Sequence, residues 1–160
     1  MENSHVVGVA KDTNIARLAL VGLSDKPGTA FRIFSLLAKN KINVDIILQS
    51  IGRNDTKDIS FTVAKSDLAA AEEVLEKYKT SIGFDSVQVS DQIAKISIVG
   101  AGMINNPGVA SDMFGALYNA DININMISTS EIKVSVLVDI KDADRAVQVV
   151  HDKFFKEFGE

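Results

Sequence analysis

The chain has 160 residues, enough to bury roughly 70% of the surface that its unfolded form exposes and to build a hydrophobic core without disulfides. Apolar residues make up 46% and charged residues 24%, with only two prolines, which excludes an intrinsically disordered chain. The net charge is −4 and the lysines and arginines are scattered, which argues against a nucleic-acid-binding surface.

The first predicted strand runs from Ile15 to Leu23, because apolar residues such as Leu18 and Leu20 occupy alternate positions. Pro27 follows at the entry to a predicted helix, where its missing N–H is tolerated. The helix ends near Lys39, since cations favour the negative end of a helix. Its apolar side is formed by Ala30, Ile33, Phe34 and Leu37.

Two further strands are predicted from Val44 to Gln49 and from Ile59 to Val63, with a turn at 52–55 between them. Ser66 and Asp67 suit the N-cap of a second helix, and 86–90 reads as a short fourth strand. The order strand, helix, strand, strand, helix, strand is that of a split βαβ, or ferredoxin-like, unit. Such a unit has both helices on one face of an antiparallel sheet, so the predicted class is α+β.

The second half of the chain repeats the first. The offset is a constant 80 residues from Pro27 to Ser50. The matching segments are Ile15–Gly22 with Ile93–Gly100, Pro27–Phe34 with Pro107–Phe114, and Lys41–Ile47 with Asp121–Ile127. A residue present in both copies serves the fold, whereas a polar residue present in only one copy is a candidate for function.

The second copy lacks a fourth strand, because the chain ends after a helix that Asp142 is predicted to cap. An uncovered sheet edge leaves a row of unpaired backbone groups. The apolar segment from His5 to Ala10 is the only one left unassigned, so we expect it to complete the second sheet; a frayed terminus is the alternative. The predicted domains are residues 15–91, and residues 93–158 together with the N-terminal strand 5–10.

Motifs for catalysis and for metals find little support. Val99–Asn105 begins like a dinucleotide-binding fingerprint, but Asn105 stands where the third glycine is needed. His5 and His151 have no partner at metal-ligand spacing, and the chain has no cysteine. We therefore expect no catalytic residues, no metal and no cofactor. The start of the chain lacks the features of a signal peptide, so we expect a cytoplasmic location without a membrane partner.

The loop before the first helix is the strongest candidate for a binding site. Backbone N–H groups after Pro27 lie at a helix N-terminus, which favours a carboxylate. Asp25 and Asp45 are predicted at the same end of the sheet, where they suit an ammonium group, so the ligand would be a free α-amino acid. Asn125 replaces Asp45 in the second copy, which favours a functional role for the acids. The alternative for Asp25 is a cap of the turn.

Several motifs, in order along almost the whole chain, resemble the C-terminal regulatory region of aspartate kinase, a tandem pair of ACT domains. They are Ser24–Gly28, Asn43–Gln49, Val99–Met103, Pro107–Val109 and Ile127–Ile132. The resemblance implies feedback control of lysine, threonine and methionine biosynthesis by bound threonine, lysine or both. It also implies a homodimer of side-by-side ACT units that partners an aspartate kinase catalytic chain or domain. The opening of a kinase domain is absent, so we expect no enzyme activity from these residues alone.

The resemblance also implies an effector site between copies. Its residues are Asp25, Lys26, Pro27, Gly28, Thr29 and Ala30 in the loop, Asn43, Val44, Asp45 and Gln49 beside the next strand, and Asn123, Ile124 and Ser130 from a neighbouring unit. Gln49 suits the hydroxyl of threonine, whereas lysine needs a further partner for its side chain. The alternative function is a free-standing ACT-like interaction module that regulates another enzyme or a transcription factor.

Overall fold

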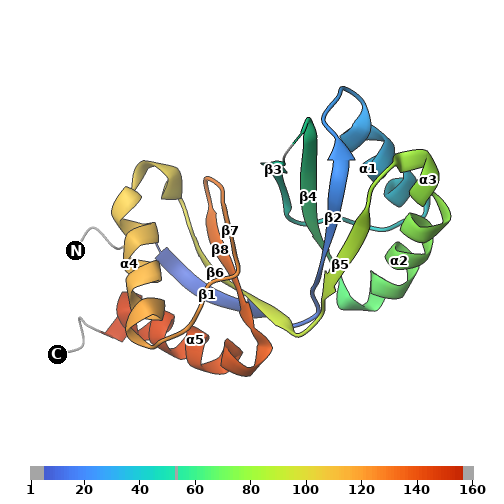
Figure 1. The fold of residues 1–160 in the computed structure, drawn as a ribbon. Helices are drawn as coiled ribbons and strands as arrows, with labels where there is room; N and C mark the ends of the chain where they lie inside the picture. The colour runs from blue at the N-terminus through green and yellow to red at the C-terminus, as the bar shows by residue number, and fades with distance from the viewer. Residues whose placement is uncertain (1–5, 53, 157–160) are drawn as a thin grey trace. The chain divides into compact units, whose positions relative to one another are not determined.

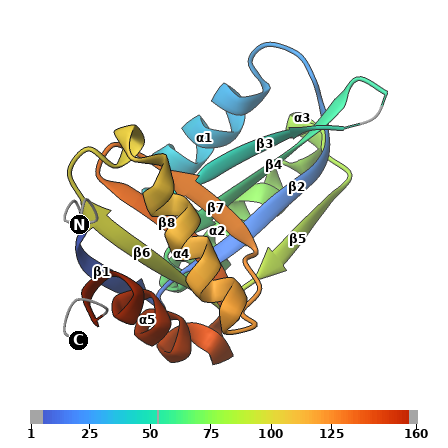
Figure 2. The same ribbon diagram turned by 90° about the vertical axis from the view of Figure 1, so that its left-hand side faces the viewer.

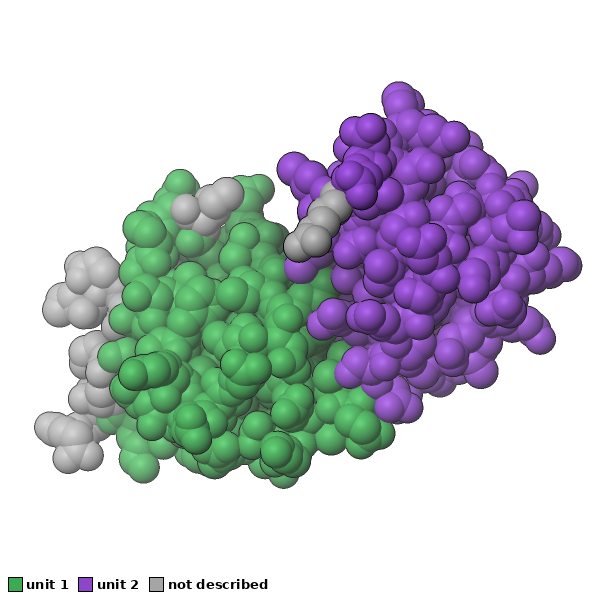
Figure 3. Space-filling model, in the orientation of Figure 1, with its two compact units in different colours: residues 1–13, 92–160 green, residues 14–91 purple. Residues whose placement is uncertain are grey.

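The computed structural model describes residues 6–52 and 54–156, so His5 and the residues from 157 onward lie outside it. The chain divides into two compact units. We call residues 14–91 the first copy and residues 1–13 with 92–160 the second copy; Figure 3 draws the first in purple and the second in green.

The first copy has a four-stranded antiparallel sheet in the order β3-β4-β2-β5, with its helices on one face (Figure 1). Its elements are β2 (Ala16–Ser24), α1 (Thr29–Lys39), β3 (Ile47–Ile51), β4 (Thr56–Val63), α2 (Leu68–Lys77), α3 (Lys79–Ile82) and β5 (Ser86–Ser90). The strands placed first and third in the copy therefore lie at the centre of the sheet. Ile33 and Leu37 of α1 pack over them and are completely buried, so the predicted apolar side of this helix is confirmed.

The second copy has the same topology in the order β1-β6-β8-β7. Its elements are β6 (Ile93–Gly100), α4 (Pro107–Asn119), β7 (Met126–Thr129), β8 (Lys133–Asp139) and α5 (Ala143–His151), together with β1 (Val6–Asp12) from the start of the chain. Figure 2 shows α4 and α5 on the near side of this sheet. Each copy thus has a ferredoxin-like fold with a separate hydrophobic core, as predicted.

The N-terminal strand completes the second sheet, which confirms the prediction for this segment. Strand β1 pairs antiparallel with β6, from Val6 opposite Gly100 to Asp12 opposite Lys95. Val6 is buried in the second core, and the Lys11 ammonium contacts the Asp144 carboxylate of α5 at 2.6 Å. A strand from one end of the chain therefore covers the edge that the other end leaves open.

Three local predictions were wrong. Strand β3 begins at Ile47 rather than Val44, because Asp45 and Ile46 both bond to Thr62, whose hydroxyl also accepts the N–H of Ile46 at 3.0 Å. The one-to-one register with β4 therefore starts only at Ile47, opposite Phe61. Asp67 and Asp142 occupy N-cap positions, but neither side chain caps its helix. The Asp142 carboxylate instead accepts a hydrogen bond from Arg145 at 2.8 Å. Within the described ranges, none of the helices is long and apolar enough to cross a membrane.

Candidate functional site

The loop between β2 and α1 in the first copy is open to solvent. Asp25, Lys26, Pro27 and Gly28 are all exposed. Gly28 has a φ of 93°, a left-handed conformation that an L-residue adopts only with strain, and helix α1 begins directly after it. The first N–H groups of any helix lack partners within the helix. This loop therefore leaves donors at an accessible helix start, as the sequence predicts.

Thr29 links the start of helix α1 to the end of strand β2 by a hydrogen bond. Its side chain is buried, and its hydroxyl donates to the carbonyl of Ser24 at 3.1 Å. The N–H of Lys26 donates to the same carbonyl, also at 3.1 Å. Thr29 is thus a structural residue of the loop, whereas Ala30 is half-buried against the core.

Asp25 has a partner that sequence reasoning missed. The Lys57 ammonium lies 3.7 Å from an Asp25 carboxylate oxygen, with the Lys57 side chain 9% exposed and that of Asp25 53% exposed. Lys57 is in phase with the core-facing residues Ile59 and Phe61 of β4, which is the signal that could have found it. The Asp25 carboxylate therefore pairs with a buried cation of β4.

Asn43, Val44 and Asp45 lie in the irregular segment that precedes β3. The N–H of Asp45 donates to the Thr62 carbonyl at 3.0 Å, which fixes the backbone while the side chain is exposed. Val44 packs against the first core, whereas Asn43 is exposed. This segment therefore presents polar side chains beside an anchored backbone.

Gln49 lies on β3 at the edge of the sheet, opposite Ile59 of β4. All five residues of β3 are exposed, including Ile51 at 93%. The Gln49 side chain is therefore accessible for a hydrogen bond, as its predicted role requires.

The equivalent segment of the second copy has the same backbone hydrogen bond, and its side chains bond to one another. The N–H of Asn125 donates to the Leu137 carbonyl at 2.7 Å, which matches the bond made by Asp45. The Asn125 amide then bonds to Asp139 and accepts from Asn123, both at 3.3 Å. Asn125 is thus engaged within its own copy.

The remaining predicted contacts also belong to the second copy. Asn123 and Ser130 are exposed and Ile124 is half-buried. The Ser130 hydroxyl accepts a bond from the N–H of Ile132 at 3.4 Å, within its own turn. An approach of these three residues to the loop of a first copy stays a prediction.

The loop before α4 in the second copy is held by hydrogen bonds within that copy. It contains a 3-10 turn, Met103–Asn105, and α4 begins at Pro107 itself. Met103 is buried in the second core, and its N–H donates to the Glu131 carbonyl at 2.9 Å. The Asn106 amide donates to the Gly102 carbonyl at 2.8 Å. This loop uses its polar groups for its own structure.

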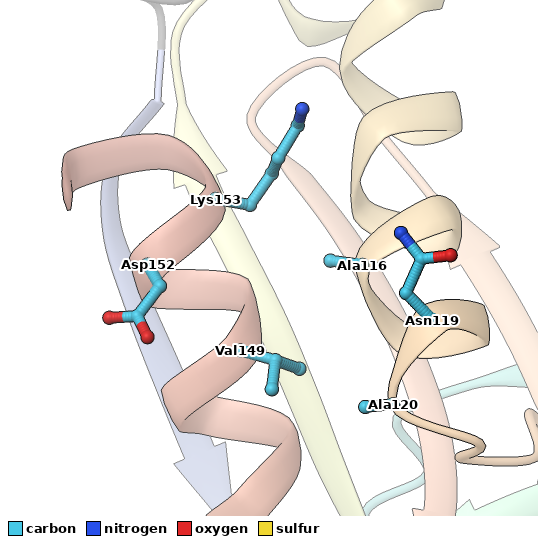
Figure 4. A pocket seen from close by; sticks show the side chains of 6 residues that line it. All are labelled: Ala116, Asn119, Ala120, Val149, Asp152 and Lys153. Carbon is cyan, nitrogen blue, oxygen red and sulfur yellow. The ribbon is translucent and has the colours of Figure 1, made fainter. Parts of the chain in front are cut away.

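A cavity of about 480 Å³ lies in the second copy, away from the predicted residues (Figure 4). It opens between α4 and the end of α5, and its walls are Ala116, Asn119, Ala120, Val149, Asp152 and Lys153. The small side chains of Ala116 and Ala120 contribute to this space, so it follows from helix packing. Among the residues that the structure describes, no group of three or more His, Cys, Asp or Glu side chains is placed to hold a metal ion.

Comparison with known proteins identifies the domain family and related proteins. A family model for the ACT domain matches residues 18–78 and 96–154. The chain is 47% identical over 151 residues to an aspartokinase of Helicobacter pylori strain 26695, a match that covers 94% of this chain and 37% of that protein.

Two solved structures match over nearly their whole length. The regulatory subunit of aspartate kinase from Thermus thermophilus, in a ligand-free form, has a TM-score of 0.88 and 38% identity, and the match covers 94% of this chain and 99% of that one. A structure of aspartokinase alpha and beta subunits has a TM-score of 0.86 and 45% identity, with 93% of this chain and 98% of that one covered.

The chain belongs to the ACT domain family and carries two ACT domains in tandem. Within that family it corresponds to the regulatory portion of aspartate kinases. It spans about 37% of the length of the curated aspartokinase that it matches, and its 160 residues contain no kinase domain.

Proposed function

We propose that the first copy binds threonine, lysine or both, and that this binding inhibits an aspartate kinase catalytic chain or domain by feedback. The observation that supports this function best is the difference between the two loops that precede α1 and α4. The first leaves a helix start and carboxylates accessible, whereas the second folds Met103 into the core and bonds its polar groups internally. Only the first is suited to a ligand.

The chemistry of the loop favours a free α-amino acid. A carboxylate on the N–H groups after Gly28 gains charge-assisted hydrogen bonds and the favourable end of the helix dipole. The ammonium group would lie near Asp25 or Asp45. The Gln49 side-chain amide would accept a hydrogen bond from a threonine hydroxyl or donate one to it. Asn123, Ile124 and Ser130 of a neighbouring unit would complete the site.

Calorimetry with threonine and with lysine tests the proposal, using Asp45→Ala and Asn125→Ala as a matched pair. Each charge-assisted bond contributes roughly 1.5–3 kcal/mol, so Asp45→Ala should weaken binding ~10- to 150-fold. Asn125→Ala should change it little, because that side chain bonds within its own copy. No heat from either amino acid with the unaltered chain would favour the interaction-module alternative, and equal losses in the two variants would contradict the assignment to the first copy.

We also propose a homodimer. Strand β3 is at the edge of its sheet and exposes Ile47, Leu48 and Ile51, and β7 at the other sheet's edge exposes Ile127. Apolar edge strands pair with other chains unless they are covered. A monomer by light scattering at tens of micromolar, with effector present, would refute the dimer.

A further inference from the structure

Lys57 occupies an unusual place for a lysine. It lies on the core-facing side of β4, opposite Leu23 on one neighbouring strand and Ile51 on the other, and only 8% of the residue is exposed. Lysine is almost never buried to this extent without a partner, because removal of an ammonium group from water is unfavourable. The Asp25 carboxylate is the partner that compensates this charge.

The ion pair between Lys57 and Asp25 is long, and its Asp25 member is exposed to solvent. The 3.7 Å between Lys57 Nζ and Asp25 Oδ1 exceeds the 2.7–2.9 Å that is typical of a charge-assisted hydrogen bond. Asp25 is half exposed, so its carboxylate has room for a second donor. The Asp25 carboxylate is therefore the accessible member of the pair, and the Lys57 ammonium is the buried member beneath it.

The backbone around the pair is anchored independently of it. The N–H of Asp25 donates to the Asp55 carbonyl at 2.9 Å, and the N–H of Gly22 donates to an Asp58 carboxylate oxygen at 3.0 Å. The first bond joins the β2–α1 loop to the turn before β4, and the second joins β2 to β4, from which Lys57 comes. The two charged side chains can therefore exchange partners while the backbone of the loop stays in place.

The second copy lacks this arrangement. Ile59 pairs with Leu20 and Val134 pairs with Ile98, which are equivalent positions, so Ile132 is the counterpart of Lys57. Ile132 is 56% exposed and carries no charge. The buried cation is thus specific to the copy whose loop is open.

We propose that Lys57 is the cationic half of the effector site and determines its specificity for the carboxylate of a zwitterionic α-amino acid. The bound carboxylate becomes a partner of the Lys57 ammonium, and the bound ammonium takes its place on Asp25. Each charge keeps an opposite charge beside it throughout, which avoids a buried lysine without a counter-ion. This inference rests on the proposed function, because it assumes that the first copy binds an amino acid.

The test compares threonine with threonine amide, and lysine with lysine amide, by calorimetry. The amides keep the side chain and the α-ammonium group but lack the carboxylate charge. The unaltered chain should bind each acid at least tenfold more tightly than its amide. Lys57→Met should weaken binding of the acids ~10- to 150-fold and reduce that preference to about threefold or less, whereas Lys57→Arg should retain most of it. Lys77→Met, which removes an exposed lysine of α2, serves as the control and should change neither quantity.

If Lys57 has a purely structural role, Lys57→Met will lower the melting temperature but leave the preference for the acid over the amide unchanged. That result would overturn the proposal. If the unaltered chain binds neither amino acid, the proposed function fails instead, so the two failures are distinct. Should Lys57→Met not fold, NMR of the unaltered chain after ¹³C-dimethylation of its lysines provides a second measurement. The signal that is missing from Lys57→Arg should shift on titration with the amino acid, and an unmoved signal at saturation would refute the contact.

Discussion

The two copies share one topology but differ in the loop that precedes the first helix of each. Between the shared glycine and proline the first copy has the residues 23–26 and the second has 101–106, so the second loop is longer by two residues. The longer loop turns Met103 into the core and closes over it. In the shorter segment Leu23 is buried in the first core, residues 24–26 are exposed, and Lys57 of β4 lies opposite Leu23.

This difference shows that the same sheet and helices accommodate two loops of different length. Packing of the sheet and helices tolerates either loop, because both copies bury an equivalent set of residues, such as Leu37 in the first and Leu117 in the second. The first loop is exposed at residues 24–28, whereas in the second the Met103 N–H and the Asn106 amide are hydrogen-bonded within the copy. Three changes, one deletion and two substitutions, test this difference between the copies and are taken in order of expected effect.

Deletion of residues 1–12 should have the largest effect, because it removes β1 from the second copy alone. Several ladder hydrogen bonds, each contributing ~0.5–1.5 kcal/mol, are lost together with the burial of Val6. Hydrogen exchange should accelerate in β6 and β8, while β4 of the first copy should exchange at its original rate. Unchanged exchange in β8 would contradict the dependence of the second copy on this strand.

Met103→Ala should destabilise the second copy by roughly 2–3 kcal/mol, because it removes a buried side chain and leaves a cavity. Lys26→Ala in the open loop of the first copy is the matched control, and it should stay within about 0.5 kcal/mol in chemical denaturation. The amino-acid affinity should be unaffected by Met103→Ala. A large loss of affinity in this variant would mean that the second loop also contributes to binding.

Ser97→Ala should have the smallest effect, about 1 kcal/mol in the free energy of unfolding. The Ser97 and Ser135 hydroxyl groups hydrogen-bond at 2.7 Å in a buried position, so the substitution leaves the Ser135 hydroxyl without this partner. At the equivalent pair of the first copy, Ala19 lies opposite Ser60. The double variant, with alanine at both positions, should be no less stable than Ser97→Ala, and a further loss would indicate that the hydroxyl groups act independently.

The fold was predictable because it follows from patterns that recur along the chain. Alternation of apolar residues located the strands, and the repeat fixed their order in both copies. The assignment of the N-terminal segment came from counting: the second copy needed a fourth strand, and one apolar segment remained. Its antiparallel pairing with β6 follows the same rule that pairs β5 with β2.

The predicted caps failed for a reason that lies outside such patterns. Asp142 has the residue type and the position of an N-cap, but Arg145 one turn later competes for its carboxylate. The start of β3 was misplaced because Ile46 donates its N–H to the hydroxyl of Thr62 on β4. Both depend on which of two available partners a polar group contacts.

The sequence by itself determined the two ferredoxin-like copies, the place of strand β1 in the second sheet, and the position of the β2–α1 loop with its acidic residue. Each of these depends on periodic burial or on the type of residue at one position, which are local properties of a sequence. Only the tertiary structure placed Lys57 next to Asp25, 32 residues earlier in the chain. That contact depends on the register of β4 against β2 and on the bond from the Asp25 N–H to the Asp55 carbonyl, neither of which is encoded in the alternation of apolar and polar residues.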